Sequence, residues 1–287
     1  MKEGQMIDFA IQGIYPPSLQ ALVDGKVASR VRRKDSSLYG FSEEAQQCAD
    51  NYMGWATLAS EPPCPIDEIQ SFADEMMACG LKTVILIGQG GSTQAPMTLT
   101  KYNKPDSSLI TFKTLDSVSA VRVRTILAEC DPKTTLVIQS SKSGGTIEPT
   151  LVMKAVRTIL AETLPEEEIP SHLVAITDPG SELEARAKEE GWAKVFNGEP
   201  TVGGRYSALS VFGLVPAALV GIDIKKVVES AREAEELCSA DDLDNPASNL
   251  AAFLFDNYQN GRDKFSFFTP KRGRVLGLWI EQLVAES

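Results

Sequence analysis

Hydroxyl and glycine residues surround a single lysine in the stretch SKSGGTIEPT, which begins at Ser141 and follows the apolar run TTLVIQS. The apolar run has the composition of a buried strand. Ser141, Ser143 and Thr146 would place hydroxyl donors at the start of the next helix, and Lys142 would add a positive charge. The first turn of a helix leaves backbone N–H groups unpaired and attracts anions. The stretch is therefore predicted to bind a phosphate group.

A second glycine-rich turn, GQGGS, follows another apolar run and contains Gly91 and Ser92. It also leads toward a helix N-terminus, where glycines would let the backbone approach an anion closely. Thr93 occupies the position at which the motif G-x-G-x-x-G requires its last glycine, so the dinucleotide fingerprint is broken. Both turns admit a plainer interpretation, in which Gly, Ser and Thr simply cap two helices.

The segment VGGRYS places two glycines directly before Arg205. Such a pair would let the backbone adopt positive φ and project the arginine from a turn into a cleft. A guanidinium group keeps its proton and could stabilise an oxyanion that forms during a reaction. The alternative is a surface arginine beside a helix cap.

Gln282 and Glu286 lie four residues apart in a segment predicted to be helical, so they would share one helix face. Their neighbours are mostly apolar, and this helix is therefore expected to be largely buried. A carboxylate in such surroundings would have a raised pKa and could act as a general base. A solvated helix face is the alternative. His172, which is the only histidine, precedes a predicted strand and is expected to have a structural role.

Short apolar runs, often β-branched, are predicted to be strands, and helical patterns separate most of them. The runs are Thr83–Gly88, Leu109–Phe112, Thr135–Gln139, Leu173–Thr177 and Ala193–Asn197. The alternation predicts a parallel sheet of five strands covered by helices on both faces, which is a three-layer α/β/α fold. In a flavodoxin-like strand order, the two glycine-rich turns would follow neighbouring strands. They would then meet at the crevice where such folds bind ligands.

Helical patterns dominate on either side of the predicted sheet. We therefore divide the chain into a helical N-terminal segment that packs on the core (1–80), a sheet domain (81–204), a helical connection (205–261) and a final segment (262–287). In the final segment, DKFSFFTP is predicted to be a strand and GRVLGLWIEQLVAES a helix. That helix has no stop signal, so we expect the natural protein to continue beyond Ser287.

Composition narrows the class of protein. The formal net charge of −11 argues against a nucleic-acid partner, because such a partner requires clustered Lys and Arg. No apolar run approaches the roughly 20 residues that span a bilayer, and the N-terminus lacks the pattern of a signal peptide. The five cysteines include no C-x-x-C pair, so neither a disulfide framework nor a zinc site is indicated. We expect a cytoplasmic protein without a membrane partner.

Several stretches together resemble the glucose-6-phosphate isomerase family, in particular the bacterial form that is fused behind a transaldolase. They are ILIGQGGST, SKSGGTIEPT, VAITDPGSELEARAKEEG, NGEPTVGGRYSALSVFGLVPAALVGID and WIEQLVAES. The resemblance implies sugar isomerase (SIS) domains and an enzyme of glycolysis and gluconeogenesis. Such an enzyme interconverts glucose 6-phosphate and fructose 6-phosphate through a cis-enediolate, without a metal or other cofactor.

The resemblance also assigns roles to residues of this sequence. The substrate would be bound by Gly91, Ser92, Gln282 and the turn Ser141, Lys142, Ser143, Gly144, Gly145 and Thr146, with the turn on its phosphate. Arg205 would stabilise the cis-enediolate, and Glu286 would move the proton between C2 and C1. The family usually has a threonine after the lysine and another threonine pair further on. This chain departs from that pattern with Ser143 and the two glycines.

By the same resemblance, residues 81–204 would be a first SIS domain and residues 262–287 the start of a second one. The rest of the second domain would supply a histidine that helps to open the sugar ring and a lysine near the chain end. We therefore expect this chain alone to be inactive or nearly so, and the full-length protein to form a homodimer. The alternative is a non-catalytic SIS-type sugar-phosphate sensor, which would have no use for Arg205 or Glu286. A nucleotide-dependent dehydrogenase is disfavoured by the broken glycine motif.

Overall fold

The computed structural model describes residues 15–285, and this part of the chain divides into two compact units. One unit contains the described residues up to Ser60 together with Val228–Phe268. The other contains Glu61–Val227 and the described residues from Thr269 onward. Every residue predicted to do chemistry, apart from Glu286, belongs to the second unit, which we call the sheet unit.

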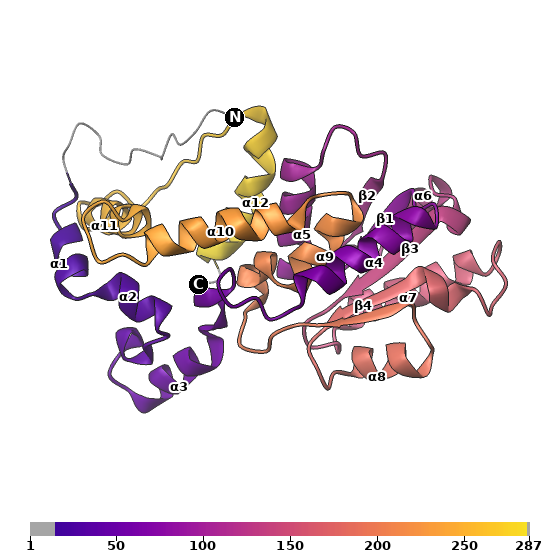
Figure 1. The fold of residues 1–287 in the computed structure, drawn as a ribbon, viewed down its shortest axis with the longest axis horizontal. Helices are drawn as coiled ribbons and strands as arrows, with labels where there is room; N and C mark the ends of the chain where they lie inside the picture. The colour runs from indigo at the N-terminus through magenta and orange to yellow at the C-terminus, as the bar shows by residue number, and fades with distance from the viewer. Residues whose placement is uncertain (1–14, 286–287) are drawn as a thin grey trace. The chain divides into compact units, whose positions relative to one another are not determined.

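Parallel strands form one five-stranded sheet in the described part of the sheet unit, in the order β2-β1-β3-β4-β5 (Figure 1). The strands are β1 (Thr83–Ile87), β2 (Thr111–Leu115), β3 (Thr135–Ser140), β4 (Leu173–Thr177) and β5 (Lys194–Asn197). Every residue of the three central strands β1, β3 and β4 is buried, as their continuous apolar sequences predict. The order confirms the flavodoxin-like arrangement.

Helices cover both faces of the sheet (Figure 1). On one face lie α6 (Ala120–Ala128), α7 (Ile147–Leu160) and α8 (Glu182–Glu189), whose apolar side chains form one core cluster with alternate residues of the central strands. On the other face, α9 (Val211–Leu219) packs against α4 (Ile66–Ala78), α5 (Gly91–Asn103) and strands β1 and β4. The helices that follow β1 and β3 therefore lie on opposite faces, which places a topological switch point between these two strands.

Helix α9 is the core helix that its continuous apolar sequence predicts, because every one of its residues is buried. Ser210 caps its N-terminus by accepting a hydrogen bond from the backbone N–H of Phe212. The 3₁₀ helix η5 (Gly204–Leu209) precedes it, so the segment that carries Arg205 is a separate element tied to the start of a buried helix.

The other unit is built from short helices: α1 (Leu19–Asp24), α2 (Val27–Arg32), η1 (Ser36–Tyr39), α3 (Glu43–Tyr52), η2 (Gly54–Thr57), the main part of α10 (Ile224–Cys238) and α11 (Pro246–Gln259). Glu235 of α10 accepts hydrogen bonds from the backbone N–H groups of Ala59 and Ser60. Asp256 of α11 accepts one from the backbone of Ser18 at the start of α1. These bonds join segments that lie far apart in the sequence.

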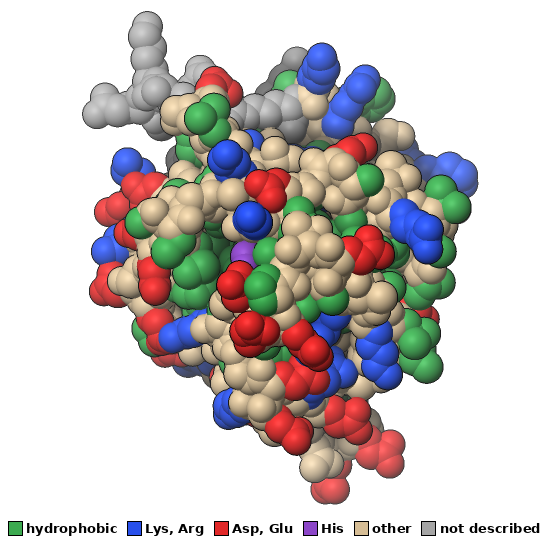
Figure 2. Space-filling model, turned by 90° about the vertical axis from the view of Figure 1, so that its right-hand side faces the viewer, with side chains coloured by type: hydrophobic (Ala, Val, Ile, Leu, Met, Phe, Trp, Pro, Cys, Tyr) green, Lys and Arg blue, Asp and Glu red, His purple; other side chains and the backbone are tan. Residues whose placement is uncertain are grey.

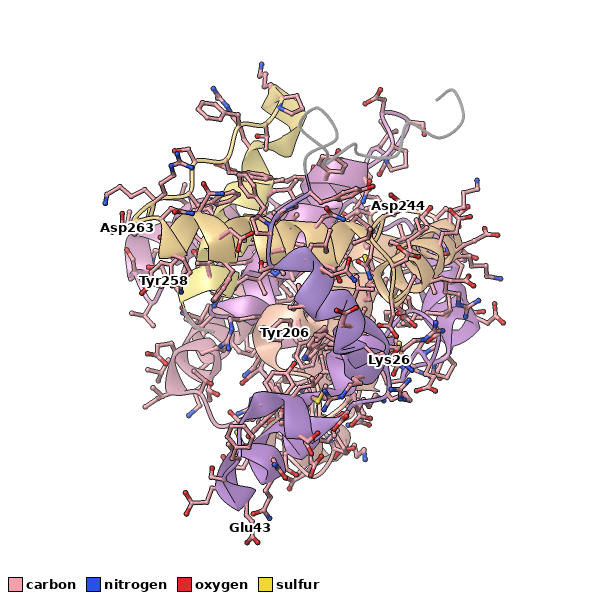
Figure 3. All side chains as sticks on the ribbon, turned by 90° about the vertical axis from the view of Figure 1, so that its left-hand side faces the viewer. Lys26, Glu43, Tyr206, Asp244, Tyr258 and Asp263 are labelled. Atoms are coloured by element: carbon pink, nitrogen blue, oxygen red, sulfur yellow. The ribbon has the colours of Figure 1, made fainter. Side chains whose placement is uncertain are left out.

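The predicted strand DKFSFFTP is wrong, since residues 262–270 have no regular secondary structure. Phe265, Phe267 and Phe268 are 53%, 47% and 93% exposed. A strand requires a partner for its backbone hydrogen bonds, and the described part of the chain provides none here. The segment can be located in Figure 3 from the labels of Tyr258, near the end of α11, and Asp263, near the start of the segment.

The expectation that the last helix is largely buried is also wrong. Helix α12 (Leu276–Ala285) follows the 3₁₀ helix η6 (Lys271–Val275) and has no buried residue. It packs on α5, η5 and η6, and its outward side chains, including Leu278 and Val284, have no neighbouring layer in the described residues. Two further 3₁₀ turns, η3 (Pro132–Thr134) and η4 (Ile169–His172), precede strands β3 and β4.

The boundaries of the two compact units differ from the predicted segment boundaries at 80, 204 and 261. The reason is that α4, which precedes residue 80, and α9, which follows residue 204, both pack on the sheet layer.

Acidic and basic side chains are interspersed over the face shown in Figure 2, without a broad basic region on that face. Among the described residues, no helix is long and apolar enough to cross a membrane.

Candidate functional site

The stretch that begins at Ser141 forms the turn between β3 and α7, and we call Ser141–Thr146 the phosphate turn. Its backbone is held against the end of β4: the N–H of Ser141 donates to the carbonyl of Ile176 at 3.0 Å. The carbonyl of Lys142 accepts from the N–H of Asp178 at 3.0 Å and from Oγ1 of Thr177 at 3.3 Å. The turn is therefore fixed to a neighbouring strand before any ligand binds.

The two glycines of the phosphate turn have different surroundings. Gly144 has φ +69°, and a Cβ added there would lie 2.9 Å from the backbone nitrogen of Leu183 and from Cβ of Ser181. Only glycine fits this position without displacing the start of α8. Gly145 is exposed and would meet no atom within 4 Å. Ser143 is exposed as well, so the outer part of the turn is open to solvent.

Neither α5 nor α7 has a side-chain cap in the part of the chain that the structure describes. Their N-cap positions are Gly90 and Thr146, and the hydroxyl of Thr146 instead accepts a bond from that of Ser141 at 3.4 Å. Side chains cap α3, α6, α8, α9 and α11 (Ser42, Ser119, Ser181, Ser210 and Asn245), whereas α1, α2 and α4 also lack a side-chain cap among the described residues. Neither turn therefore caps its helix through a side chain. In α5, however, the N–H groups of Ser92 and Thr93 already donate to the carbonyls of Gln89 and Gly90, at 3.2 and 3.0 Å. The backbone donors left for an anion lie mainly at the start of α7, where Ile147 and Glu148 precede Pro149.

The turn after β1 lies beside the phosphate turn because β1 and β3 are paired strands. A Cβ added at Gly88 would lie 3.0 Å from the carbonyl oxygen of Ser140 and 3.4 Å from Cβ of Ser92. Ser92 in the first turn of α5 and Ser140 at the end of β3 thus both lie beside Gly88. The hydroxyl of Ser140 is fully buried at this edge and has no hydrogen-bond partner among the described residues.

Arg205 reaches the same edge through a direct backbone contact. A Cβ added at Gly91 would lie 2.5 Å from the carbonyl carbon and oxygen of Gly204 and 2.9 Å from the backbone nitrogen of Arg205. The guanidinium carbon of Arg205 lies 5.7 Å from the ring centre of Tyr206, which is labelled in Figure 3. Gly91 and Gly204 therefore allow close packing between the starts of α5 and η5. The prediction of positive φ at the glycines before Arg205 is wrong, since neither Gly203 nor Gly204 has positive φ.

Helix α12 adds the last part of the site. Nε1 of Trp279 donates a hydrogen bond to the carbonyl of Arg205 at 2.8 Å. A Cβ added at Gly90 would lie 3.0 Å from Nε2 of Gln282, so this amide stands directly over the turn after β1. Glu286 lies outside the described residues. The structure thus brings Gly91, Ser92, Arg205 and Gln282 together at the carboxyl edge of β1.

Lys142 has different neighbours from those predicted. Its ammonium group forms an ion pair with Oδ2 of Asp178 and donates to the carbonyl oxygens of Pro200 and Glu199, at 3.0 Å and 3.4 Å. The side chain therefore connects two loops of the protein. This geometry gives no support to the prediction that Lys142 contacts the phosphate directly.

The sequence profile of the family described as "Phosphoglucose isomerase" matches residues 67–265, which is more than half of the chain. The chain belongs to the phosphoglucose isomerase family. It is 29% identical to the glucose-6-phosphate isomerase of Parasynechococcus marenigrum over 99% of this chain. It is 32% identical to that of Prochlorococcus marinus (strain MIT 9515) over 77% of this chain.

Two solved structures have a fold similar to that of this chain. A hypothetical protein from Thermus thermophilus is 28% identical, with a TM-score of 0.76 over 94% of this chain and 61% of that one. A glucose-6-phosphate isomerase from Chlamydia trachomatis is 19% identical, with a TM-score of 0.66 over 92% of this chain and 55% of that one. The chain spans 55% and 44% of the lengths of the two curated relatives named above.

Two residues of the site in this phosphoglucose isomerase family member were not predicted from the sequence. Asp178 follows β4 directly, and an acidic residue at the carboxyl end of a buried strand is a signal that could have indicated it. Trp279 gave no such signal, because its role depends on where α12 packs.

His172 has the structural role expected of it: its Nδ1 donates to the carbonyl of Thr135 at 2.9 Å. No group of three His, Cys, Asp or Glu side chains suited to a metal occurs among the described residues.

Proposed function

We propose that this chain forms the phosphate-binding half of an aldose–ketose isomerase active site that acts on glucose 6-phosphate and fructose 6-phosphate. The observation that carries the proposal is the pair of helix N-termini, at α5 and α7, that lack side-chain caps at one topological switch point. The start of α7 and the hydroxyl groups of the two turns can direct several donors at one dianion, and each charge-assisted hydrogen bond contributes about 1.5 to 3 kcal/mol. Membership of the phosphoglucose isomerase family supports the choice of substrate.

The phosphate turn and Ser92 would hold the phosphate, which leaves the sugar carbons to extend toward Arg205 and Gln282. Binding at the phosphate end fixes the position of the reacting end, so that the catalytic groups need not capture a freely moving sugar. The guanidinium of Arg205 would stabilise the negative charge that develops on the cis-enediolate oxygens. Gln282 would contact a sugar hydroxyl, and the structure places its amide over the turn after β1.

Glu286, four residues after Gln282 in the sequence, would be the general base. Its carboxylate would remove the proton from C2 and return it to C1, so that one group serves both transfers. Because the chain spans about half of its relatives, we propose that it has little or no isomerase activity alone. A phosphate sensor of the same fold would have no use for Arg205, and membership of the phosphoglucose isomerase family favours the enzyme.

Calorimetric titration with fructose 6-phosphate tests the binding part of this proposal. We expect the chain to bind fructose 6-phosphate, and the double variant Ser143→Ala/Thr146→Val to bind it about tenfold or more weakly because charge-assisted donors are lost. Fructose without phosphate is the matched control ligand and should not bind measurably. Equal binding of fructose and fructose 6-phosphate would contradict the phosphate role of the turn.

From the partial coverage of the curated relatives we propose that the natural protein is longer than this chain, and catalysis is tested on the full-length gene product. An isomerisation assay should show activity that Glu286→Gln lowers by several orders of magnitude, because general acid–base catalysis and its positioning are both lost. Binding of fructose 6-phosphate by that variant should persist. Activity that survives Glu286→Gln would exclude this residue as the base.

A further inference from the structure

The ion pair between Lys142 and Asp178 lies where three segments of the sheet unit meet. Lys142 belongs to the phosphate turn, and Asp178 follows β4. The third segment is residues 198–204, the loop that leads from β5 to Arg205, and its Glu199 and Pro200 offer their carbonyl oxygens to the Lys142 ammonium. The side chains of Lys142 and Asp178 are only 26% and 17% exposed, so the pair is largely shielded from water.

The hydrogen-bonding capacity of the Lys142 ammonium is fully used by these contacts. An ammonium group has three N–H donors and no acceptor. The three acceptors present are Oδ2 of Asp178 and the carbonyl oxygens of Glu199 and Pro200. Lys142 could contact a bound phosphate only by leaving a carboxylate and two carbonyls, which would strand the partly buried charge of Asp178 at a considerable cost.

Asp178 is also packed against the loop that follows β5. A Cβ added at Gly198 would lie 2.7 Å from Oδ1 of Asp178 and 2.6 Å from the ring of Phe212 in α9. The N–H of Gly198 donates to the carbonyl of Thr177 at 2.7 Å. The start of this loop is therefore held against the end of β4, and Lys142 holds its next two residues.

We propose that Lys142 and Asp178 are positioning residues that couple the phosphate turn to the loop carrying Arg205. This coupling rests on the proposed function, in which the phosphate turn binds the phosphate of the substrate. Lys142 sets the distance between the group that holds the phosphate and the group that stabilises the reacting end of the sugar. The phosphate itself is bound by backbone N–H groups and hydroxyls of the turn.

The two roles of Lys142 predict opposite effects of Asp178→Asn. If Lys142 contacts phosphate, removing the competing carboxylate frees its charge and leaves the affinity for phosphate unchanged or stronger. If Lys142 acts through Asp178, then Asp178→Asn and Lys142→Met each weaken the binding of inorganic phosphate, by about fivefold to tenfold, since both remove the side-chain bond that fixes the phosphate turn to the end of β4. The double variant should bind no more weakly than the weaker single variant, because the two changes remove one interaction.

The experiment combines calorimetric titration of the chain with inorganic phosphate and amide hydrogen exchange of the ligand-free chain. We expect amides in residues 198–204 to exchange faster in Lys142→Met and in Asp178→Asn, and Lys142→Arg to restore most of the protection and affinity. The matched control is Lys113→Met, which removes the same charge and breaks the ion pair of Lys113 with Glu129 between β2 and the end of α6. That variant should change neither measurement at the site.

Two results would overturn the inference. One is loss of phosphate affinity in Lys142→Met with unchanged or stronger binding in Asp178→Asn. The other is unchanged exchange of residues 198–204 in both variants. Failure of the unaltered chain to bind phosphate would count against the proposed function instead, and the exchange measurement would still decide whether Lys142 and Asp178 hold the loop.

Discussion

At the scale of single residues, adjacent glycines in the phosphate turn offer a matched comparison. Gly144→Ala should destabilise the chain by about 1–2 kcal/mol for the positive φ alone, with a further cost from contact with Leu183 and Ser181. Gly145→Ala meets no atom within 4 Å and should stay within about 0.5 kcal/mol of the unaltered chain. Urea unfolding of both variants measures the difference.

The Gly144→Ala variant should also bind inorganic phosphate more weakly, since the turn must move away from α8 to admit the new methyl group. Equal stability of the two variants would mean that the turn is not held as the structure shows. The sequence could predict that this turn needs glycine. It could not distinguish the two positions, because the difference arises from the packing of α8, which lies far along the chain.

At the scale of elements, the start of α8, which lies against the phosphate turn, is held by a capping arrangement. Ser181 accepts a hydrogen bond from the N–H of Glu184 at 3.1 Å, and the Glu184 carboxylate accepts from the N–H of Gly180. Ser181→Ala should lower the free energy of unfolding by about 1 kcal/mol, as loss of an N-cap does elsewhere. An unchanged urea midpoint in this variant would contradict the assignment of Ser181 as the cap.

The same element predicts a pH dependence. The hydrogen bond from Lys188 and then that from the Gly180 N–H lower the pKa of Glu184 below its ordinary value near 4.5. Because the folded state favours the carboxylate, this contribution is present above the ordinary pKa and is lost as the pH falls below it. Urea midpoints at pH 7 and pH 3.5 should therefore differ less in Glu184→Gln than in the unaltered chain. An equal difference in both would contradict this role of Glu184.

The strands show which elements could be predicted from the sequence pattern and which could not. The three central strands were predicted almost residue for residue, because full burial requires continuous apolar runs. The edge strand β2 was predicted about two residues too early, since its sequence TFKTL is only partly buried and carries a weak pattern. The failed strand at residues 262–270 has the composition of a strand but no partner in the described chain. Composition alone cannot supply that partner.

At the scale of the whole molecule, two compact units predict unfolding in two steps. The sheet unit contains nearly all of the fully buried large side chains, whereas Leu19 is the one such residue in the described part of the other unit. The sheet unit should therefore resist urea to a higher concentration. Trp55 belongs to the other unit, which is built from short helices, and Trp192 and Trp279 belong to the sheet unit. Tryptophan fluorescence can therefore follow each unit separately.

The variant Trp55→Phe would report on the sheet unit alone, and Trp192→Phe/Trp279→Phe on the other unit. We expect the second variant to show the lower urea midpoint, with circular dichroism of each variant as a check that the substitutions themselves leave stability unchanged. Coincident transitions in the two variants would show that the units unfold as one.

The backbone contact between Gly91 and Gly204 sets how the candidate site can change shape. Gly91 and Gly204 open α5 and η5 and carry no side chains, so their spacing does not respond to the rotamer exchange that occurs in picoseconds to nanoseconds. Only a change of backbone torsion angles can separate them, and collective motions of that kind belong to slower timescales. The distance between these two segments should consequently stay constant as the temperature rises, up to the point at which the sheet unit itself unfolds.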